Sequence, residues 1–486
     1  MTFPVRSMHI KWLLPFLLLV VSAKNLQAQQ SDMGFATLGS VTYKEKITQL
    51  EKFTVPKKYS DKSSQAWYNE ILTDRNKGLL NAFKENAVIY DSLLLNTCYN
   101  ILNRIAAANK NYKFDTVKLY INRSVVANAV CYGEGTVMVN LGLFLWLDNE
   151  DELALVIAHE LAHQLMNHSE SKIEKSISML TSDDFKQELK DIKKADYGKF
   201  DRFRKLMKGL NIESGKHSTY KETEADSLGF VLIRNAKYDI SNAPKLLLKL
   251  DKVDDLFTSG KLYTLKDFFE KTPIDQSYFK VKPKYNGLSS VNVTMNADKD
   301  LDSIKTHPDC IKRYEALSGK VNGLTLNCCT VLTNVLQQYK EYAMLEVVRH
   351  LYENNAIGLC AHMCLFALKN NYNPAVYDCF LSMCFSRLFY DDKKLQRFNA
   401  ANTYARRATT LKELQDFLFQ VSTPELEKLA DYFLNNNTDT RSEDYGFANL
   451  MYNTQVKMKD TVTAYADFNK KFPTSKYQYL ITKKEK

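Results

Sequence analysis

Two histidines and a glutamate about a third of the way along the chain have the spacing of a metal site. Residues 159–163 read His-Glu-Leu-Ala-His. On a helix, His159 and His163 lie one turn apart on the same face, which is the geometry that two imidazoles need to bind one zinc ion. Glu160 would then stand beside the activated water as a general base. The competing interpretation is a surface helix that carries these three residues by chance, and such motifs do carry that risk.

A second acidic motif follows about sixty residues later. Glu222, Glu224 and Asp226 lie in the stretch Glu-Thr-Glu-Ala-Asp. Glu222 and Asp226 would share a helix face. A catalytic zinc ion takes three protein ligands and leaves one position for water, so Glu222 suits the third position. Asp226 suits a place behind a ligand histidine, which it would orient. Taken alone, such an acidic run is usually structural, and its value comes from the first motif.

The elements around these motifs can be predicted from local patterns. Asn149 is a suitable helix cap, and Glu152 three residues later completes a capping-box pattern. Apolar residues then recur at helical spacing, which predicts that the histidines lie on a helix. They are Leu153, Val156, Ile157, Leu161 and Leu165.

A small sheet is predicted just before this helix. Residues 115–122 alternate apolar and polar side chains, which is typical of a strand. Residues 128–140 read as a hairpin that turns at Gly133-Glu134-Gly135. A sheet beside a metal-bearing helix would let an edge strand pair with the backbone of an extended peptide.

The remaining segments before residue 320 are mostly helical in pattern. We expect a loosely held polar entry segment, two helices before the sheet, an insertion of exposed charge-rich helices, a helix that opens at Glu222, one further amphipathic helix, and a long polar connection. These correspond to residues 29–60, 64–109, 169–216, 222–232, 238–252 and 253–305.

The last third of the chain reads as successive helices. Breaks fall near Asn354-Asn355, residues 370–374 and Asp391-Asp392. That spacing resembles helix-hairpin repeats of the tetratricopeptide kind. Residues 360–364 read Cys-Ala-His-Met-Cys, but the histidine would point away from the two cysteines on a helix, so buried core is the better interpretation.

Composition and the N-terminus bear on location and partners. The chain has 486 residues, 45% hydrophobic and 25% charged, with a net charge of +10 and no dense basic block. This argues against nucleic-acid binding and leaves peripheral association with an anionic membrane open. Residues 1–28 have the basic start, apolar core and small final residue of a secretory signal cleaved near Ala28. An uncleaved anchor is the alternative. Nine cysteines, an odd number, cannot all pair within the chain.

With both motifs placed, the chain resembles the zinc metallopeptidases of the HtpX/Ste group, which are gluzincins of metallopeptidase family forty-eight. The residues that carry the resemblance are the stretch from Asn128 to Leu143, the helix lead-in at residues 148–154, the His-Glu-x-x-His motif with His168 five residues on, the motif from Glu222 to Asp226, and Thr306-His307-Pro308 with Arg313.

The resemblance implies one Zn²⁺ per chain, a peptidase reaction, Glu222 rather than Glu224 as third ligand, and Asp226 behind a ligand histidine. It also makes His307 a candidate, either as a donor to the oxyanion or as a cap on the metal at rest. The family usually has Ser-Arg before the ligand glutamate, where this chain has Ser218-Thr219. The chain resembles the exported, BepA-like branch of that family.

The sequence therefore predicts an α+β fold with three parts. A signal peptide spans residues 1–28, a mostly helical zincin-type domain with a small sheet spans 29–320, and an all-α, tetratricopeptide-like domain spans 321–486. We expect a zinc endopeptidase in the periplasm or outside the cell that acts on protein substrates, by family analogy misfolded envelope proteins. The helical domain would be an interaction surface. The alternative is a latent or chaperone-like binding protein with a gated or structural zinc site.

Overall fold

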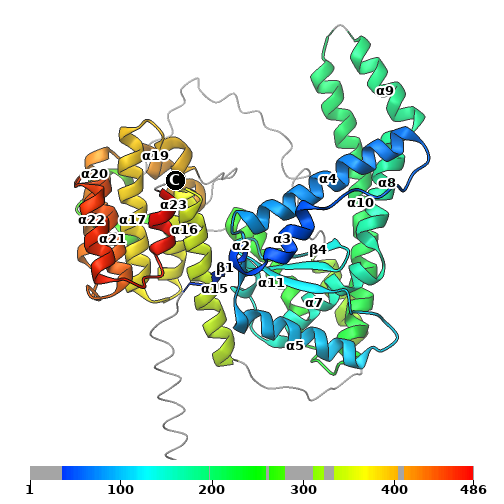
Figure 1. Ribbon diagram of the computed structural model, residues 1–486, viewed down its shortest axis with the longest axis horizontal. Helices are drawn as coiled ribbons and strands as arrows, with labels where there is room; N and C mark the ends of the chain where they lie inside the picture. Colours follow the sequence, from blue (N-terminus) through cyan, green and yellow to red (C-terminus); the bar gives the residue numbers. More distant parts are fainter. Residues whose placement is uncertain are drawn as a thin grey trace, which may run out of the picture. The chain divides into compact units, whose positions relative to one another are not determined.

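The computed structural model describes residues 35–195, 197–258, 262–279, 310–321, 333–402 and 410–484. The chain divides into two compact units, residues 1–36 and 37–486. All elements below lie in the second unit, which combines one small sheet with many helices (Figure 1). The predicted mostly helical α+β fold is confirmed. No described helix has both the length and the apolar character that a bilayer crossing requires. The predicted signal peptide lies outside the described residues.

The sheet has five strands in the order β1-β2-β3-β5-β4. β3 and β5 run parallel, and the other neighbours are antiparallel. The predicted strand and hairpin are confirmed as β3, β4 and β5. Gly135 closes the hairpin at φ +76°, and a Cβ atom there would lie 2.1 Å from the Thr116 carbonyl oxygen, so glycine is required. The strands are β1 (Thr37–Leu38), β2 (Val88–Tyr90), β3 (Lys118–Asn122), β4 (Ala129–Gly133) and β5 (Thr136–Asn140).

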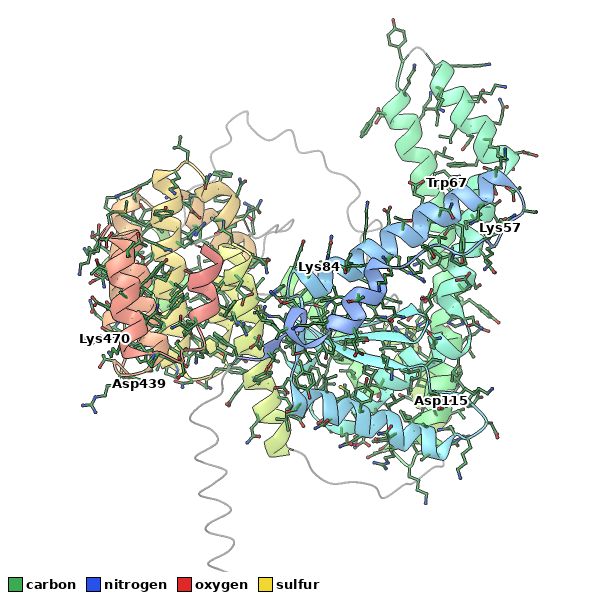
Figure 2. All side chains as sticks on the ribbon, in the orientation of Figure 1. Lys57, Trp67, Lys84, Asp115, Asp439 and Lys470 are labelled. Carbon is green, nitrogen blue, oxygen red and sulfur yellow. The ribbon has the colours of Figure 1, made fainter. Side chains whose placement is uncertain are left out.

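The N-terminal elements are more ordered than the sequence predicts. We expected a loosely held segment over residues 29–60, but residues 37–51 form β1 and two helices. β1 pairs with β2, and Leu50 is buried beside Phe83 and Tyr120. Long-range packing, which local patterns do not encode, therefore orders this segment. Figure 2 labels Trp67 and Lys84 on the long helix α4 that covers it. The helices are α2 (Gly39–Thr42), α3 (Lys44–Glu51), α4 (Lys62–Lys84), α5 (Ser92–Ala108) and α6 (Leu141–Phe144).

The helix that carries the first motif is α7 (Glu150–Leu165). It begins as predicted, because the Asn149 side chain accepts a hydrogen bond of 2.9 Å from the Glu152 backbone N–H. Glu152 accepts 2.8 Å from the backbone N–H of Asp148 rather than that of the cap. Most of α7 is buried, including His159, Glu160, Leu161 and Ala162 of the motif. The site is therefore built on a core helix rather than a surface helix.

Helices α8 (His168–Thr181), α9 (Asp183–Lys194) and α10 (Lys199–Asn235) follow. The prediction that Glu222 opens a helix is wrong, because α10 begins at Lys199 and runs through it. Continuous backbone hydrogen bonding carries the helix across residues whose composition alone signals no start or stop. The predicted insertion is only partly exposed, since Ile173 and Ile177 of α8 pack against α4.

The helix predicted over residues 238–252 begins later, as α11 (Lys245–Thr258). Residues 239–244 form turns instead. The Asp239 carboxylate accepts backbone and side-chain hydrogen bonds from Ser241 and Asn242, which holds that turn. Three short elements come next among the described residues. They are α12 (Leu265–Phe269), the 3-10 helix η1 (Gln276–Phe279) and α14 (Cys310–Val321).

The C-terminal segment is helical throughout its described parts, as predicted. Helices end at Glu353, Lys369 and Lys393, beside the predicted breaks, and Asn355 and Asn371 turn the chain at positive φ. Tetratricopeptide character and a boundary at residue 320 stay predictions. The helices are α15 (Thr333–Glu353), α16 (Ile357–Lys369), α17 (Pro374–Lys393), α18 (Arg397–Ala401), α19 (Thr410–Gln420), α20 (Thr423–Asn435), α21 (Glu443–Gln455), α22 (Thr461–Lys471) and α23 (Gln478–Lys484).

A buried group of four charges ties α15 to the end of β3. The guanidinium of Arg123 donates two hydrogen bonds of 2.7 Å to the Glu353 carboxylate. Arg349 donates 2.7 Å to Glu353 and 3.0 Å to Glu346. All four side chains are at most 3% exposed. Because two cations face two carboxylates, the group is electrically balanced, which burial requires.

Candidate metal centre and active site

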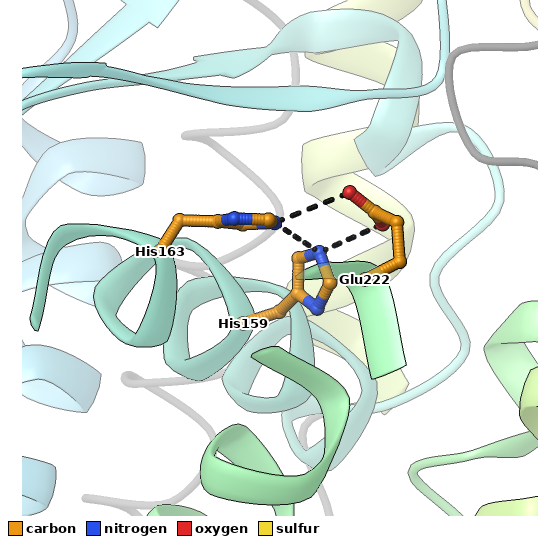
Figure 3. Close-up of side chains that lie close together, drawn as sticks. All are labelled: His159, His163 and Glu222. Carbon is orange, nitrogen blue, oxygen red and sulfur yellow. Dashed lines mark hydrogen bonds and ion pairs between the residues drawn. The ribbon is translucent and has the colours of Figure 1, made fainter. Parts of the chain in front are cut away.

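The structure brings His159, His163 and Glu222 together. Figure 3 shows the two imidazoles rising from α7 toward the Glu222 carboxylate on α10. The two Nε2 atoms are 3.0 Å apart. The Glu222 oxygens lie 3.3 Å from each Nε2. Within the described part of the chain, these are the only three metal-ligating side chains that converge in this way.

The spacing of these donor atoms fits a zinc ion. Zinc bonds to nitrogen and oxygen of about 2.0–2.1 Å in a tetrahedron place neighbouring ligand atoms about 3.3–3.4 Å apart. The observed separations of 3.0–3.3 Å match that edge. Two neutral imidazoles and one carboxylate are the donor set of several catalytic zinc sites, in which the fourth position stays open. The three residues can therefore hold a zinc ion without rearrangement of the backbone.

α10 can approach α7 this closely because it carries a glycine at the contact. A Cβ atom at Gly229 would lie 3.1 Å from the His159 backbone nitrogen and 3.2 Å from the Ala158 carbonyl carbon. Any larger residue would push the two helices apart where the ligands meet. The sequence holds a signal for this position, since Gly229 follows the acidic motif by three residues, but only the structure shows its partner.

Asp226 lies directly behind the first ligand histidine. Its Oδ1 is 3.0 Å from His159 Nδ1, so that nitrogen carries the proton and Nε2 is free to bind a metal. Burial by itself lowers the pKa of His159. The Glu222 and Asp226 carboxylates raise it by more, so the pKa of His159 lies at about 10.

Arg313 of α14 fixes Asp226 in turn. Its guanidinium donates two hydrogen bonds of 2.7 Å to the Asp226 carboxylate, and one nitrogen lies 3.2 Å from Glu222. Burial raises the pKa of Asp226, but Arg313 and His159 lower it more, so the carboxyl stays ionised. The sequence placed Arg313 only by resemblance, and its contact with Asp226 spans 87 residues.

Glu160 lies beside His159 at the wall of a small apolar cavity of about 30 Å³. The Glu160 side chain is buried, with 3% of the residue exposed. Five leucines from α6, α7 and α11 contribute to the cavity wall. They are Leu143, Leu155, Leu246, Leu247 and Leu250. A substrate whose scissile bond lies at Glu160 could place a small apolar side chain here.

Side-chain hydrogen bonds hold the edge strand of the sheet against the end of α7. β4 is the last strand in the order and pairs only with β5 among the described strands. The Gln164 side chain at the end of α7 accepts 3.1 Å from the Gly135 N–H, and Ser169 donates 3.1 Å to the Cys131 carbonyl. β4 is therefore an edge strand tied to the end of α7, and its pairing with an extended peptide stays a prediction.

Two other sequence candidates have different outcomes. His307 and its neighbours lie outside the described residues, so its predicted role stays a prediction. Cys360 and Cys364 are fully buried on α16, as expected of core residues. His362 is also buried, and its Nδ1 lies 2.7 Å from the Tyr263 hydroxyl.

Comparison with known proteins places the site within a family. Residues 96–321 match the family model described as peptidase family M48. The three candidate ligands and Arg313 all lie inside that match. Residues 96–321 form a domain of peptidase family M48. The family resemblance predicted from the sequence is therefore confirmed, and the M48 domain is a metallopeptidase domain.

Two curated relatives match parts of the chain. The beta-barrel assembly-enhancing protease of Yersinia pestis is 36% identical over 81 residues, which is 17% of this chain and 16% of that protein. The mitochondrial metalloendopeptidase OMA1 of Schizosaccharomyces pombe is 29% identical over 202 residues, which is 40% of this chain and 57% of that protein. Both matches span less than two thirds of the relative.

Proposed function

We propose that this chain is a zinc-dependent endopeptidase with one Zn²⁺ held by His159, His163 and Glu222. The observation that carries the proposal is the convergence of these three side chains at separations of 3.0–3.3 Å inside the M48 domain. A zinc ion bound there would supply Lewis acidity to the attacking water and to the scissile carbonyl. A structural zinc site usually closes with four protein ligands, whereas this one offers three.

Glu160 is proposed as the general base. It accepts the proton of the attacking water and then donates it to the leaving amine as the peptide bond breaks. Its buried position next to His159 and at the wall of the cavity supports this role, since a general base must lie within reach of the proton that it accepts. Asp226 and Arg313 keep His159 in the tautomer that leaves Nε2 free to bind the metal.

The substrate is proposed to lie as an extended strand against β4. Main-chain hydrogen bonds to an edge strand bind a peptide without regard to most of its side chains. Such binding suits a protease that acts on many unfolded proteins. The name of the Yersinia relative and the proposed signal peptide together support envelope proteins as substrates and an exported location.

Metal analysis of the mature protein tests the ligand set. We expect close to one zinc per chain in the wild type and strongly reduced zinc and casein cleavage in Glu222→Gln. A matched control is Glu174→Gln, an exposed glutamate on α8 that pairs only with Lys58 among the described residues. Wild-type protein that takes up no zinc on reconstitution would refute the proposal.

The base is tested separately with Glu160→Gln. This variant should keep its zinc and lose proteolysis by a factor of about 10²–10⁴, the usual contribution of a general base. Full activity in Glu160→Gln would exclude the mechanism. Zinc without proteolysis in the wild type would instead favour the latent, chaperone-like alternative.

His307 is proposed to act at the same site from the segment before α14. His307→Ala separates its two predicted roles. Loss of an oxyanion donor should lower the rate of proteolysis at unchanged zinc content, whereas loss of a resting cap should raise it. Equal activity in the two proteins would remove His307 from the site.

A further inference from the structure

His163, the second proposed ligand histidine, contacts a further histidine that is not itself a proposed metal ligand. His163 Nδ1 lies 2.8 Å from His168 Nδ1. His168 is the first residue of α8 and is buried, with 6% of the residue exposed. It reaches His163 because Asn167 takes a left-handed conformation at φ 52°, which turns the chain sharply between α7 and α8. This turn folds the start of α8 back against the end of α7.

His168 in turn faces an acidic residue of the second motif. Its Nε2 lies 3.4 Å from Oε2 of Glu224 on α10. Lys221, also on α10, donates 3.1 Å to the His168 backbone carbonyl and fixes the start of α8 against that helix. Glu222, and not Glu224, is the proposed metal ligand. Glu224 points instead at the histidine behind His163.

The proton positions in this chain of contacts follow from the metal site. His163 Nε2 faces His159 and Glu222, so a metal bound there requires Nε2 without a proton. The single proton of the neutral ring is then on Nδ1, which donates to His168 Nδ1. His168 must accept there, so its own proton is on Nε2, directed at the Glu224 carboxylate. Each ring thus has one allowed tautomer.

We propose that His168 and Glu224 are positioning residues that fix the orientation and tautomer of His163 as a metal ligand. The inference rests on the proposed function only in that a metal binds at His159, His163 and Glu222. The two histidine ligands are then held by different devices. Asp226 and Arg313 orient His159. Glu224 orients His163 indirectly, through the His168 imidazole that lies between them.

Loss of either positioning residue should weaken the metal without removing a ligand. Removal of the His168 ring nitrogens leaves the Nδ1–H of His163 without its acceptor and frees the ring to adopt the tautomer that blocks the metal. Loss of such a partner behind a ligand histidine typically lowers metal affinity about 10–100-fold.

Zinc affinity of the full mature chain, measured by competition with a chromophoric chelator, tests this inference. His168→Phe keeps the ring shape but has no acceptor, and we expect zinc affinity about 10–100-fold below wild type. His168→Asn places an amide oxygen where Nδ1 stood and should recover most of that loss. Glu224→Leu, at a side chain that is 36% exposed, should weaken zinc without harm to the fold.

The visible spectrum of the Co²⁺-loaded proteins gives a readout that general destabilisation would not change. His168→Phe and Glu224→Leu should alter the ligand-field bands, while Glu174→Gln should match wild type. The thermal melting of each metal-free protein checks the fold. Wild-type affinity and spectrum in Glu224→Leu would overturn the inference even if His168→Phe fails to fold. Wild-type protein that binds no metal would instead overturn the proposed function.

Discussion

The buried charges between β3 and α15 predict a large and specific loss of stability. Arg123→Met replaces a fully buried cation by an unbranched apolar side chain about as long as the aliphatic part of arginine. Glu346 and Glu353 then share only Arg349, and one net negative charge remains buried. Breaking one partner of a buried ion pair costs about 3–5 kcal/mol. Because whole domains are stable by only about 5–15 kcal/mol, this is a large share.

Two further variants separate this mechanism from simple loss of contacts. The double variant Arg123→Met, Glu353→Met leaves one balanced pair, so it should be less destabilised than the sum of the two single variants. An exposed pair supplies the control. Lys58 and Glu174 have side chains that are 29% and 52% exposed, and Glu174→Gln should change stability by about 0–1 kcal/mol.

The assay is urea unfolding followed by tryptophan fluorescence. The Trp146 ring lies 6.1 Å from the Phe366 ring of α16, tilted by 41°, so its part of the emission reports on the contact between α16 and the segment before α7, and Trp67 on α4 contributes the rest. We expect a lower midpoint for the first transition in Arg123→Met. A change below about 1 kcal/mol, or single-variant effects that add in the double variant, would refute the reasoning.

Three further predictions concern the site and the dependence on pH. Gly229→Val should push α10 from His159 and lower zinc affinity, measured by chelator competition, and wild-type affinity would contradict the tight contact. Leu250→Trp should fill the cavity beside Glu160 and raise KM for peptides at unchanged zinc content; an unchanged KM would exclude the cavity as a subsite. Burial raises the pKa of Glu353, but Arg123, Arg349 and His350 together lower it more, to below its ordinary 4.5. The stability that the ionised Glu353 carboxylate contributes is fully present above about pH 4.5 and is lost on acidification. The urea midpoints of wild type and Arg123→Met should therefore converge at low pH.

Local patterns in the sequence predict the elements that carry the chemistry. The cap at Asn149, the apolar spacing that follows it and the one-turn separation of His159 and His163 all act within a single helix. The hairpin at Gly133-Glu134-Gly135 is equally local, since its turn requires residues that tolerate positive φ. Such features depend on neighbours within a few residues, so they can be identified without a fold.

The partners of the acidic motif cannot be predicted from local patterns. Helical spacing puts Glu222 and Asp226 on one face, and it leaves Glu224 without a purpose. Which histidine each carboxylate meets depends on how α10 crosses α7, and that crossing depends on the close contact at Gly229. The start of α10 was also misplaced, because helix continuation there depends on hydrogen bonds along the whole helix rather than on a cap.

The sequence by itself therefore predicted the three candidate ligands, the helix that carries the two histidines, and the family resemblance. Only the tertiary structure decided what stands behind each ligand. Arg313 meets Asp226 across 87 residues, and Arg123 meets Glu353 across 230. No local propensity encodes such pairs. Their partners are selected when helices pack, because a buried charge must find a counter-charge wherever the fold brings one within reach.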